Sequence, residues 1–277
     1  MKTFHLVSDC IAWRKNIVNT VGFVPTMGAL HAGHVSLIKS SKKNCNKTLV
    51  SIYINPAQFS QEEDLGSYPK TIEEDLKILK GLNVDAVFLP SDNEIYPEDK
   101  PDNFKYENSL FKKLEGKSRP HFFYGVTKVV SRLFNIVSPT HTFFGEKDAQ
   151  QSRIINQMIK DLNYNIRFIS CPTVRNENGL ALSSRNNYLS HSEQKQASVI
   201  YRGLKLVEES IKKGNVNINQ LKKVFTSVIN KNHNFQIDYI SIACNETLEE
   251  LTIWSKNSLI SVAIFYKNVR LIDNIVI

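Results

Sequence analysis

Two histidines, His31 and His34, stand three residues apart with Gly33 between them. They follow the short apolar run 21–24 and precede a stretch, beginning at Val35, whose apolar residues recur at helical spacing. Strand, glycine-containing turn and helix in this order direct backbone N–H groups and the positive end of a helix at one point. The imidazoles add side-chain donors there. This arrangement favours the binding of a polyanion such as a nucleoside triphosphate.

Further polar clusters stand where predicted strands end. Asn55 and Gln58 follow one apolar run, and the stretch 145–151 follows another. Each cluster also has a structural interpretation, because Asn55 before a proline is typical of a turn and Asp148 is a common helix cap. Their shared position at strand ends, together with the histidines, favours one common cleft.

Strand and helix signals alternate through the first two-thirds of the chain. The predicted strands cover residues 21–24, 49–54, 84–89, 142–144 and 166–169, and the predicted helices cover 35–43, 71–79, 126–137 and 149–162. This alternation predicts an α/β fold with a Rossmann-like parallel sheet and helices on both faces. Ligands of such sheets bind beyond the carboxyl ends of the strands.

The pattern changes near Pro172, where a loop rich in asparagine and glycine begins. Beyond it we expect helices at 192–212 and 217–230, then strands at 235–243, 259–265 and 269–272. We therefore divide the chain into a first domain of residues 1–173 and a smaller α+β C-terminal domain of residues 174–277.

Composition places the chain among soluble globular proteins, since 42% of its 277 residues are hydrophobic and 22% are charged. No apolar run reaches the roughly 18 residues of a membrane-spanning helix, and the first residues lack the apolar core of a secretory signal. We expect a cytoplasmic protein without a membrane partner. Four widely spaced cysteines favour reduced thiols over a zinc site. The net charge of +8 is spread over diffuse lysines, so we expect no nucleic-acid partner.

Taken together, the polar blocks resemble the motifs of the pantothenate synthetase (pantoate–β-alanine ligase) family. A lone His-x-Gly-His would indicate only a superfamily of nucleotidyltransferases and class I aminoacyl-tRNA synthetases. Five blocks in the same order make the resemblance specific. They are the stretch 25–34, Asn55-Pro56-x-Gln58-Phe59, Tyr68-Pro69, Gly145-Glu146-Lys147-Asp148-x-Gln150-Gln151 and Ser183-Ser184-Arg185-Asn186.

The resemblance implies an ATP-dependent ligase that condenses pantoate with β-alanine to give pantothenate. The pantoate carboxylate would attack the α-phosphorus of ATP, giving pantoyl adenylate and pyrophosphate, and the amine of β-alanine would then displace AMP. Mg²⁺ is expected as the companion of ATP. A homodimer is expected from the family alone.

The resemblance also implies a nucleotide site over which the C-terminal domain closes. His34 would be its proton donor, His31 would contact the phosphates, and Lys147 would supply a positive charge to them. Glycines in the first loop would let the backbone approach the phosphates. The other nucleotide-binding residues would be Met27, Gly28, Ala29, Leu30, Ala32, Gly33, Gly145, Glu146, Asp148, Val174, Leu182, Ser183, Ser184 and Arg185.

Neutral amides would form the pantoate site. Gln58 and Gln151, with Asn55, would hold the hydroxyls and carboxylate of pantoate, and Gln58 would also meet β-alanine. A fixed cation would bind too tightly a nucleophile that must react. Gln151 has the alternative of an exposed helix residue.

The metal ligands stay unknown. Glu74 and Asp75 align with acidic residues near the metal and phosphates of the family. The same stretch is also a capping box, in which Thr71 and Glu74 would satisfy N–H groups of the helix that follows. Both interpretations are open.

The sequence departs from the family pattern in two places and shares one further loop with it. His121 holds a position that is usually glycine, and Phe122 holds one that is usually histidine, so a polar role there is in doubt. Leu182 replaces a methionine at nearly constant volume. The polar loop 60–67 resembles a lid that would exclude water from an acyl adenylate.

Two other functions would share part of this pattern. A different adenylyl- or cytidylyltransferase would share the histidines, but Gln58 and Gln151 belong to the pantoate pocket. A basic nucleic-acid-binding protein with a decayed site is disfavoured, because the histidines, Lys147 and Arg185 are all retained.

Overall fold

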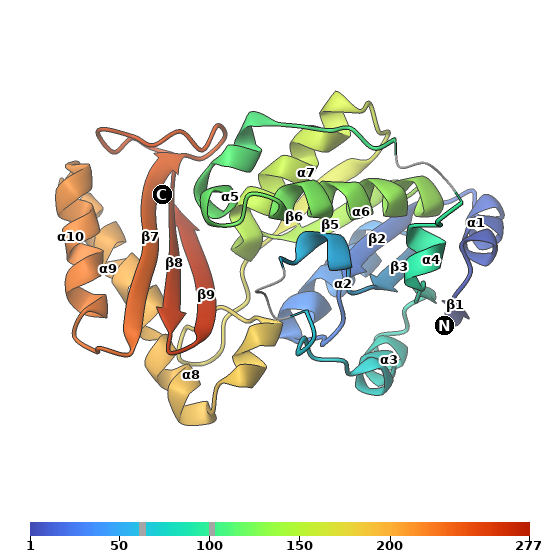
Figure 1. Cartoon of the computed structure of the whole chain (residues 1–277), viewed down its shortest axis with the longest axis horizontal. Coiled ribbons are helices and arrows are strands. Elements are labelled where there is room, and N and C mark those ends of the chain that lie inside the picture. The colour runs from blue at the N-terminus through green and yellow to red at the C-terminus, as the bar shows by residue number, and fades with distance from the viewer. Residues whose placement is uncertain (61–64, 100–102) are drawn as a thin grey trace. The chain divides into compact units, whose positions relative to one another are not determined.

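The computed structural model describes residues 1–60, 65–99 and 103–277. The chain forms two compact units, whose elements are labelled in Figure 1. The first unit comprises Met1–Phe111, Arg119–Glu146 and Gln151–Pro172. The second unit comprises Lys112–Ser118, Lys147–Gln150 and Thr173–Ile277, so two short segments that precede Pro172 belong to it.

A parallel sheet forms the centre of the first unit. Its described strands are β1 (Lys2–Phe4), β2 (Val21–Thr26), β3 (Lys47–Ile52), β4 (Ala86–Phe88), β5 (His141–Gly145) and β6 (Arg167–Cys171). They follow the order β1-β4-β3-β2-β5-β6, and all paired neighbours run parallel. From β2 the chain continues through β3 and β4 on one side, whereas β5 and β6 lie on the other. The order therefore reverses between β2 and β5, the position where doubly wound sheets bind ligands.

Helices cover both faces of this sheet, which confirms the predicted fold class. They are α1 (Val7–Lys15), α2 (Ala32–Asn44), α3 (Ile72–Gly81), α4 (Asp92–Ile95), α6 (Phe122–Val137) and α7 (Ala149–Asp161). On one face, Val24 of β2 shares a buried cluster with Ile38 of α2. On the other face, the ring of Phe23 lies 6.3 Å from that of Phe134 in α6. Alternate side chains of β2 thus enter opposite apolar layers, which explains its continuous apolar run.

The N-terminal elements β1 and α1 were not predicted from the sequence. β1 is a three-residue strand at the edge of the sheet, and Cys10 is the one residue of α1 that is buried. Neither element has the long apolar run or the one-sided apolar stripe by which strands and helices are recognised in a sequence. Pairing of β1 with β4 places both elements, and that pairing joins residues far apart in the chain.

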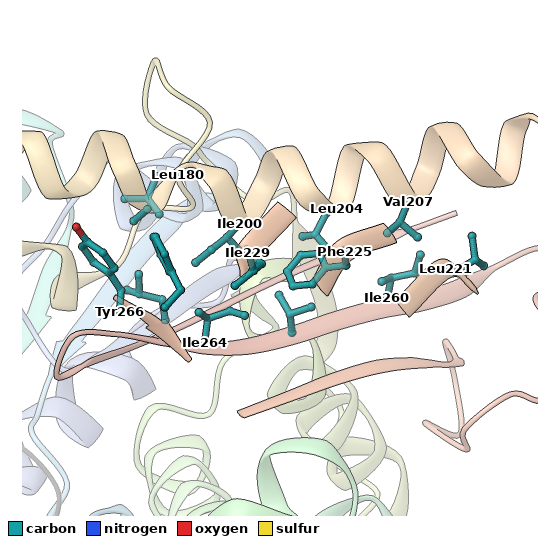
Figure 2. Packing of buried hydrophobic residues seen from close by; sticks show 14 of the residues in the cluster. Leu180, Ile200, Leu204, Val207, Leu221, Phe225, Ile229, Ile260, Ile264 and Tyr266 are labelled. Carbon is teal, nitrogen blue, oxygen red and sulfur yellow. The ribbon is translucent and has the colours of Figure 1, made fainter. Parts of the chain in front are cut away.

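The second unit has the predicted α+β form. Its elements are α5 (Leu114–Ser118), α8 (His191–Ala197), α9 (Val199–Lys212), α10 (Ile218–Ile229) and the antiparallel strands β7 (Phe235–Cys244), β8 (Ser258–Tyr266) and β9 (Val269–Val276). Apolar residues at helical spacing turn one side of α9 and α10 toward the sheet. Figure 2 shows Leu204 and Phe225 of these helices beside Ile260 and Ile264 of β8, all within one buried cluster.

The prediction of a single helix over 192–212 was wrong. The structure divides this stretch into α8 and α9 at Ser198. The Ser198 hydroxyl donates to the carbonyl of Lys195 at 2.6 Å, and such back-bonding by serine bends helices.

Within the described residues, no helix combines the length and the apolarity that a bilayer crossing requires.

Candidate active site

The histidine loop joins β2 to α2, and its two imidazoles bind backbone groups of the loop. His31 is the N-cap of α2, and its Nδ1 accepts from the Gly33 N–H at 3.1 Å. His34 Nδ1 accepts from the His31 N–H at 3.3 Å. A neutral imidazole whose Nδ1 accepts carries its proton on Nε2. The ring centroids lie 4.1 Å apart, and both rings lie at the N-terminus of α2. Two Nε2–H donors at a helix N-terminus suit the binding of phosphate oxygens.

Two glycines of the loop are needed for reasons internal to the protein. Gly28 has a φ of +86°, and a Cβ there would lie 3.0 Å from Oδ2 of Asp75. A Cβ on Gly33 would lie 2.7 Å from the ring of His31. A side chain at either position would therefore displace the groups that shape the loop.

Asp75 of α3 supports this loop through its carboxylate. The residue is 1% exposed, and it accepts from the Ala29 N–H at 2.9 Å and the Leu30 N–H at 2.8 Å. Burial raises the pKa of Asp75, and the hydrogen bonds from Leu30 and Ala29 act in the opposite direction. Thr71 also bonds the Asp75 carboxylate and caps no helix N–H through its side chain. Of the two interpretations left open for this stretch, the capping box is therefore not formed by Thr71.

The acidic residues Glu74 and Asp75 of α3 have different surroundings. Both oxygens of Asp75 face backbone N–H groups, and Glu74 is exposed. Across the described parts of the chain, no group of three or more His, Cys, Asp or Glu side chains could hold a metal ion.

Asn55 and Gln58 meet the histidine loop at the end of β3. Asn55 caps the short helix η1 (Pro56–Gln58), and its amide donates to the Gly125 carbonyl at 3.1 Å and to Gln58 Oε1 at 3.3 Å. Gln58 Nε2 donates to Sδ of Met27 at 2.8 Å. Asn55 is 1% exposed and Gln58 9% exposed, so Asn55 holds the turn while Gln58 reaches the loop.

Tyr96 belongs to the same network, although it was missed from the sequence. Its hydroxyl donates to Asn55 Oδ1 at 2.9 Å. Lys128 Nζ lies 4.8 Å and Arg132 Cζ 5.3 Å from the centroid of its ring. Two cations four residues apart on α6, a helix otherwise apolar on its buried side, are a sequence signal that could have found this cluster.

Gly125 allows α6 to lie directly against η1. A Cβ at this position would lie 2.2 Å from the Ala57 carbonyl oxygen and 2.7 Å from Cα of Gln58. We expect Gly125→Ala to lower the free energy of unfolding by about 1–3 kcal/mol, because the helix must move away. Urea denaturation measures this change. Gly81→Ala in α3 is the control, since its Cβ would meet nothing within 4 Å, and an equal loss in both variants would contradict the explanation.

The stretch after β5 begins with the short helix η3 (Glu146–Asp148), which leads into α7. In the second unit, the Lys147 carbonyl accepts from the Asn274 amide at 2.8 Å. The Lys147 side chain is 17% exposed, with its Nζ 3.4 Å from Oδ1 of Asp148. In the first unit, Ser152 donates to the Gly145 carbonyl at 2.9 Å. The backbone on either side of the predicted phosphate-binding lysine is thus held by side chains.

The adjacent glutamines of this stretch have different surroundings. Gln150 is 4% exposed, accepts from the Glu115 N–H at 2.9 Å and donates to the Lys113 carbonyl at 2.8 Å. It fastens α5 within the second unit, a role that was missed from the sequence. Gln151 is half-buried in the first turn of α7, and its predicted contact with pantoate stays a prediction.

The second unit brings Val174 and Leu182 together. The Leu182 N–H donates to the Val174 carbonyl at 3.0 Å, and Arg175 bridges to Ala181 between them. Arg175 also donates to both oxygens of the buried Asp273, at 2.6 and 2.8 Å. The predicted adenine-binding and phosphate-binding segments are therefore neighbours on a firmly held turn.

Ser183 opens the second predicted phosphate-binding loop. It is the N-cap of η4 (Ser184–Tyr188), and its hydroxyl accepts from the Arg185 N–H at 3.3 Å. Ser184 is buried, whereas Arg185 is half-buried. The loop thus starts a short helix, as the first predicted phosphate-binding loop starts α2.

The two residues that depart from the family pattern, His121 and Phe122, lie at the start of α6. Arg119 Cζ lies 3.7 Å from the centroid of the Phe122 ring, which is a cation–π contact. His121 is exposed and makes no side-chain cap for α6. An apolar ring thus replaces the usual histidine.

The lid expected at 60–67 falls in part, at 61–64, outside the described residues.

Comparison with known proteins identifies the family of the chain. The profile of the family described as Pantoate-beta-alanine ligase matches residues 2–276. The chain belongs to this family. A pantothenate synthetase of Caldicellulosiruptor saccharolyticus is 45% identical over 276 residues, which is 99% of this chain and 97% of the relative. The family resemblance and the assignment as a ligase are thereby confirmed.

Solved structures of the family have the same fold. The crystal structure of pantothenate synthetase from Thermus thermophilus has a TM-score of 0.94 and 37% identity, with 99% of each chain covered. A pantoate-beta-alanine ligase from Francisella tularensis, complexed with beta-gamma ATP and beta-alanine, has a TM-score of 0.83 and 35% identity. That alignment covers 100% of this chain and 97% of the other.

Proposed function

We propose that this member of the family condenses pantoate with β-alanine through a pantoyl adenylate. A carboxylate oxygen of pantoate forms a bond to the α-phosphorus of ATP, and the bond to the pyrophosphate leaving group breaks. The amine of β-alanine then attacks the acyl carbon, loses a proton and expels AMP. The Francisella relative, whose structure holds an ATP compound and β-alanine, supports ATP and β-alanine as substrates.

The observation that carries this proposal is the paired imidazoles at the N-terminus of α2. Both Nδ1 atoms accept from backbone N–H groups, so each neutral ring carries its proton on Nε2. In the first step, negative charge grows on the phosphoryl oxygens, and donors already in place stabilise it without reorganisation. We assign to His34 the role of proton donor, through a hydrogen bond from its Nε2–H to the growing charge, and to His31 that of a phosphate ligand.

Other residues would bind and orient the substrates. Gln58, which contacts the histidine loop through Met27, would hold pantoate next to the phosphates and later meet β-alanine. Gln151, from the start of α7, would add a second amide. Lys147 would neutralise phosphate charge as a point cation. The ribose would be bound by Gly145 and Asp148, the adenine by Val174, and the phosphates by Leu182, Ser183, Ser184 and Arg185.

Magnesium would enter this reaction on the nucleotide. Mg²⁺ retains water and binds phosphates with one or two protein oxygens rather than in an all-protein cage. That preference fits a protein whose described residues contain no group of three acidic, histidine or cysteine ligands. Cytoplasmic location and a homodimer stay predictions from the sequence.

Isotope exchange between ATP and pyrophosphate tests the proposed route. We expect exchange of labelled pyrophosphate into ATP when pantoate is present, because formation of the adenylate is reversible while β-alanine is absent. Exchange without pantoate would indicate a different acceptor. A lack of exchange in the presence of pantoate, combined with formation of pantothenate once β-alanine is added, would contradict the adenylate.

A further inference from the structure

We propose that Asp75 is a positioning residue for the histidine pair and is not a metal ligand. Its carboxylate receives two consecutive backbone N–H groups, those of Ala29 and Leu30, directly before His31. The catalytic part of this inference rests on the proposed function, whereas its structural part does not.

The backbone that Asp75 holds has an unfavourable conformation. Gly28 has a φ of 86° and Ala29 a φ of 48°, so two successive residues lie in the left-handed region. An alanine with its Cβ disfavours this region, and the surrounding structure must therefore impose it. Consecutive N–H groups in such a turn converge on one point and form a concavity for an anion. The carboxylate of Asp75 fills that concavity from inside the protein.

The support continues through the loop to both imidazoles. Leu30 precedes His31, whose own N–H donates to Nδ1 of His34 at 3.3 Å. The orientation of the peptide between Leu30 and His31 thus determines where the His34 ring is held. A shift at the carboxylate would move the Nε2–H groups relative to a bound phosphate.

Asp75 is itself anchored in the core. It stands in α3 four residues before Leu79, which is fully buried in a cluster with Val24 and Ile52 of the sheet. Ile52 also contacts the turn, since a Cβ on Gly28 would lie 3.0 Å from its Cγ2. The carboxylate therefore links a fixed helix to the loop that follows β2.

A carboxylate suits this position better than an amide. Both of its oxygens accept, one from each N–H, and an asparagine would present an NH₂ group to one of the two donors. A carboxylate whose two oxygens are engaged in this way and that is 1% exposed faces away from solvent, whereas a metal ligand must face the nucleotide.

The test compares Asp75→Asn with Glu73→Gln, which removes the same charge from an exposed position in the first turn of α3. In the ligand-free protein, Asp75→Asn should move the amide proton resonances of Ala29 and Leu30 upfield, and Glu73→Gln should leave them unchanged. In the pantothenate-forming reaction, kcat of Asp75→Asn should fall about 100-fold, because small misplacement of catalytic groups has effects of that order. The Mg²⁺ concentration at half-maximal rate should not change.

Several outcomes would overturn the inference. Unmoved amide resonances in Asp75→Asn would reject the structural support, and recovery of kcat at raised Mg²⁺ would assign Asp75 to the metal. If Asp75→Asn does not fold, through-hydrogen-bond scalar couplings from the Ala29 and Leu30 nitrogens to the Asp75 carboxyl carbon in the unaltered protein decide the question, and their absence rejects it. If the unaltered enzyme forms no pantothenate, the proposed function fails. The NMR measurements still test whether the Asp75 carboxylate holds the backbone of Ala29 and Leu30.

Discussion

His34→Ala is expected to slow pantoate-dependent release of pyrophosphate by about 10²–10⁴-fold, the range found when a positioned proton donor or charge-stabilising group is removed. The ring of His34 is tied to the His31 N–H and is half-buried at the start of α2. Its loss removes one of two donors beside the growing charge. The protein should stay folded, because the core residues of α2, such as Ile38, are untouched.

Pyrophosphate release in single turnover, together with the melting temperature, checks this expectation. His233→Ala is the matched control, since that histidine is exposed and lies in the second unit. A normal rate of release from His34→Ala would remove His34 from the reaction. A large fall in melting temperature alongside the lost rate would instead assign His34 a structural role.

Gln58→Ala is expected to weaken pantoate binding by about 10–100-fold, since loss of a buried hydrogen-bond partner costs roughly 1–3 kcal/mol. ATP binding should change much less, because the phosphates are assigned to the histidines, Lys147 and Arg185. The turn at Asn55 that starts η1 should persist, because Asn55 still donates to the Gly125 carbonyl after the change.

Isothermal titration with pantoate and with a non-hydrolysable ATP analogue separates the two affinities. Gln220→Ala provides the control, because that glutamine is exposed on α10 in the second unit. Equal losses of affinity for pantoate and for the ATP analogue would contradict the division of labour proposed for Gln58.

The main elements around the site were predictable because their signals are local. β2 carries a continuous apolar run that is buried on both faces, and α6 carries an apolar stripe at helical spacing. β1 and α1 were missed because edge pairing, rather than an apolar pattern, places them. The single helix predicted over 192–212 failed at Ser198, whose hydroxyl competes for a carbonyl of the preceding turn.

The candidate site was predictable in its blocks but not in the tasks within each block. Asn55 and Gln58 belong to one motif, yet Asn55 holds a turn while Gln58 contacts Met27. Gln150 and Gln151 are adjacent, yet Gln150 fastens α5. A motif records which residues occur together, and the direction of each side chain depends on partners outside it.

By itself, the sequence determined the family, the order of the main strands and helices around the site, and the polar blocks that follow the strands, because these depend on residue types at short spacing. Only the tertiary structure decided that Asp75 supports the loop before His31, since Ala29 and Asp75 are 46 residues apart in the chain. Likewise, Asn55 meets Gly125 across 70 residues and Gln150 meets Glu115 across 35. A buried polar group must find a hydrogen-bond partner, and which partner it finds is decided by folding.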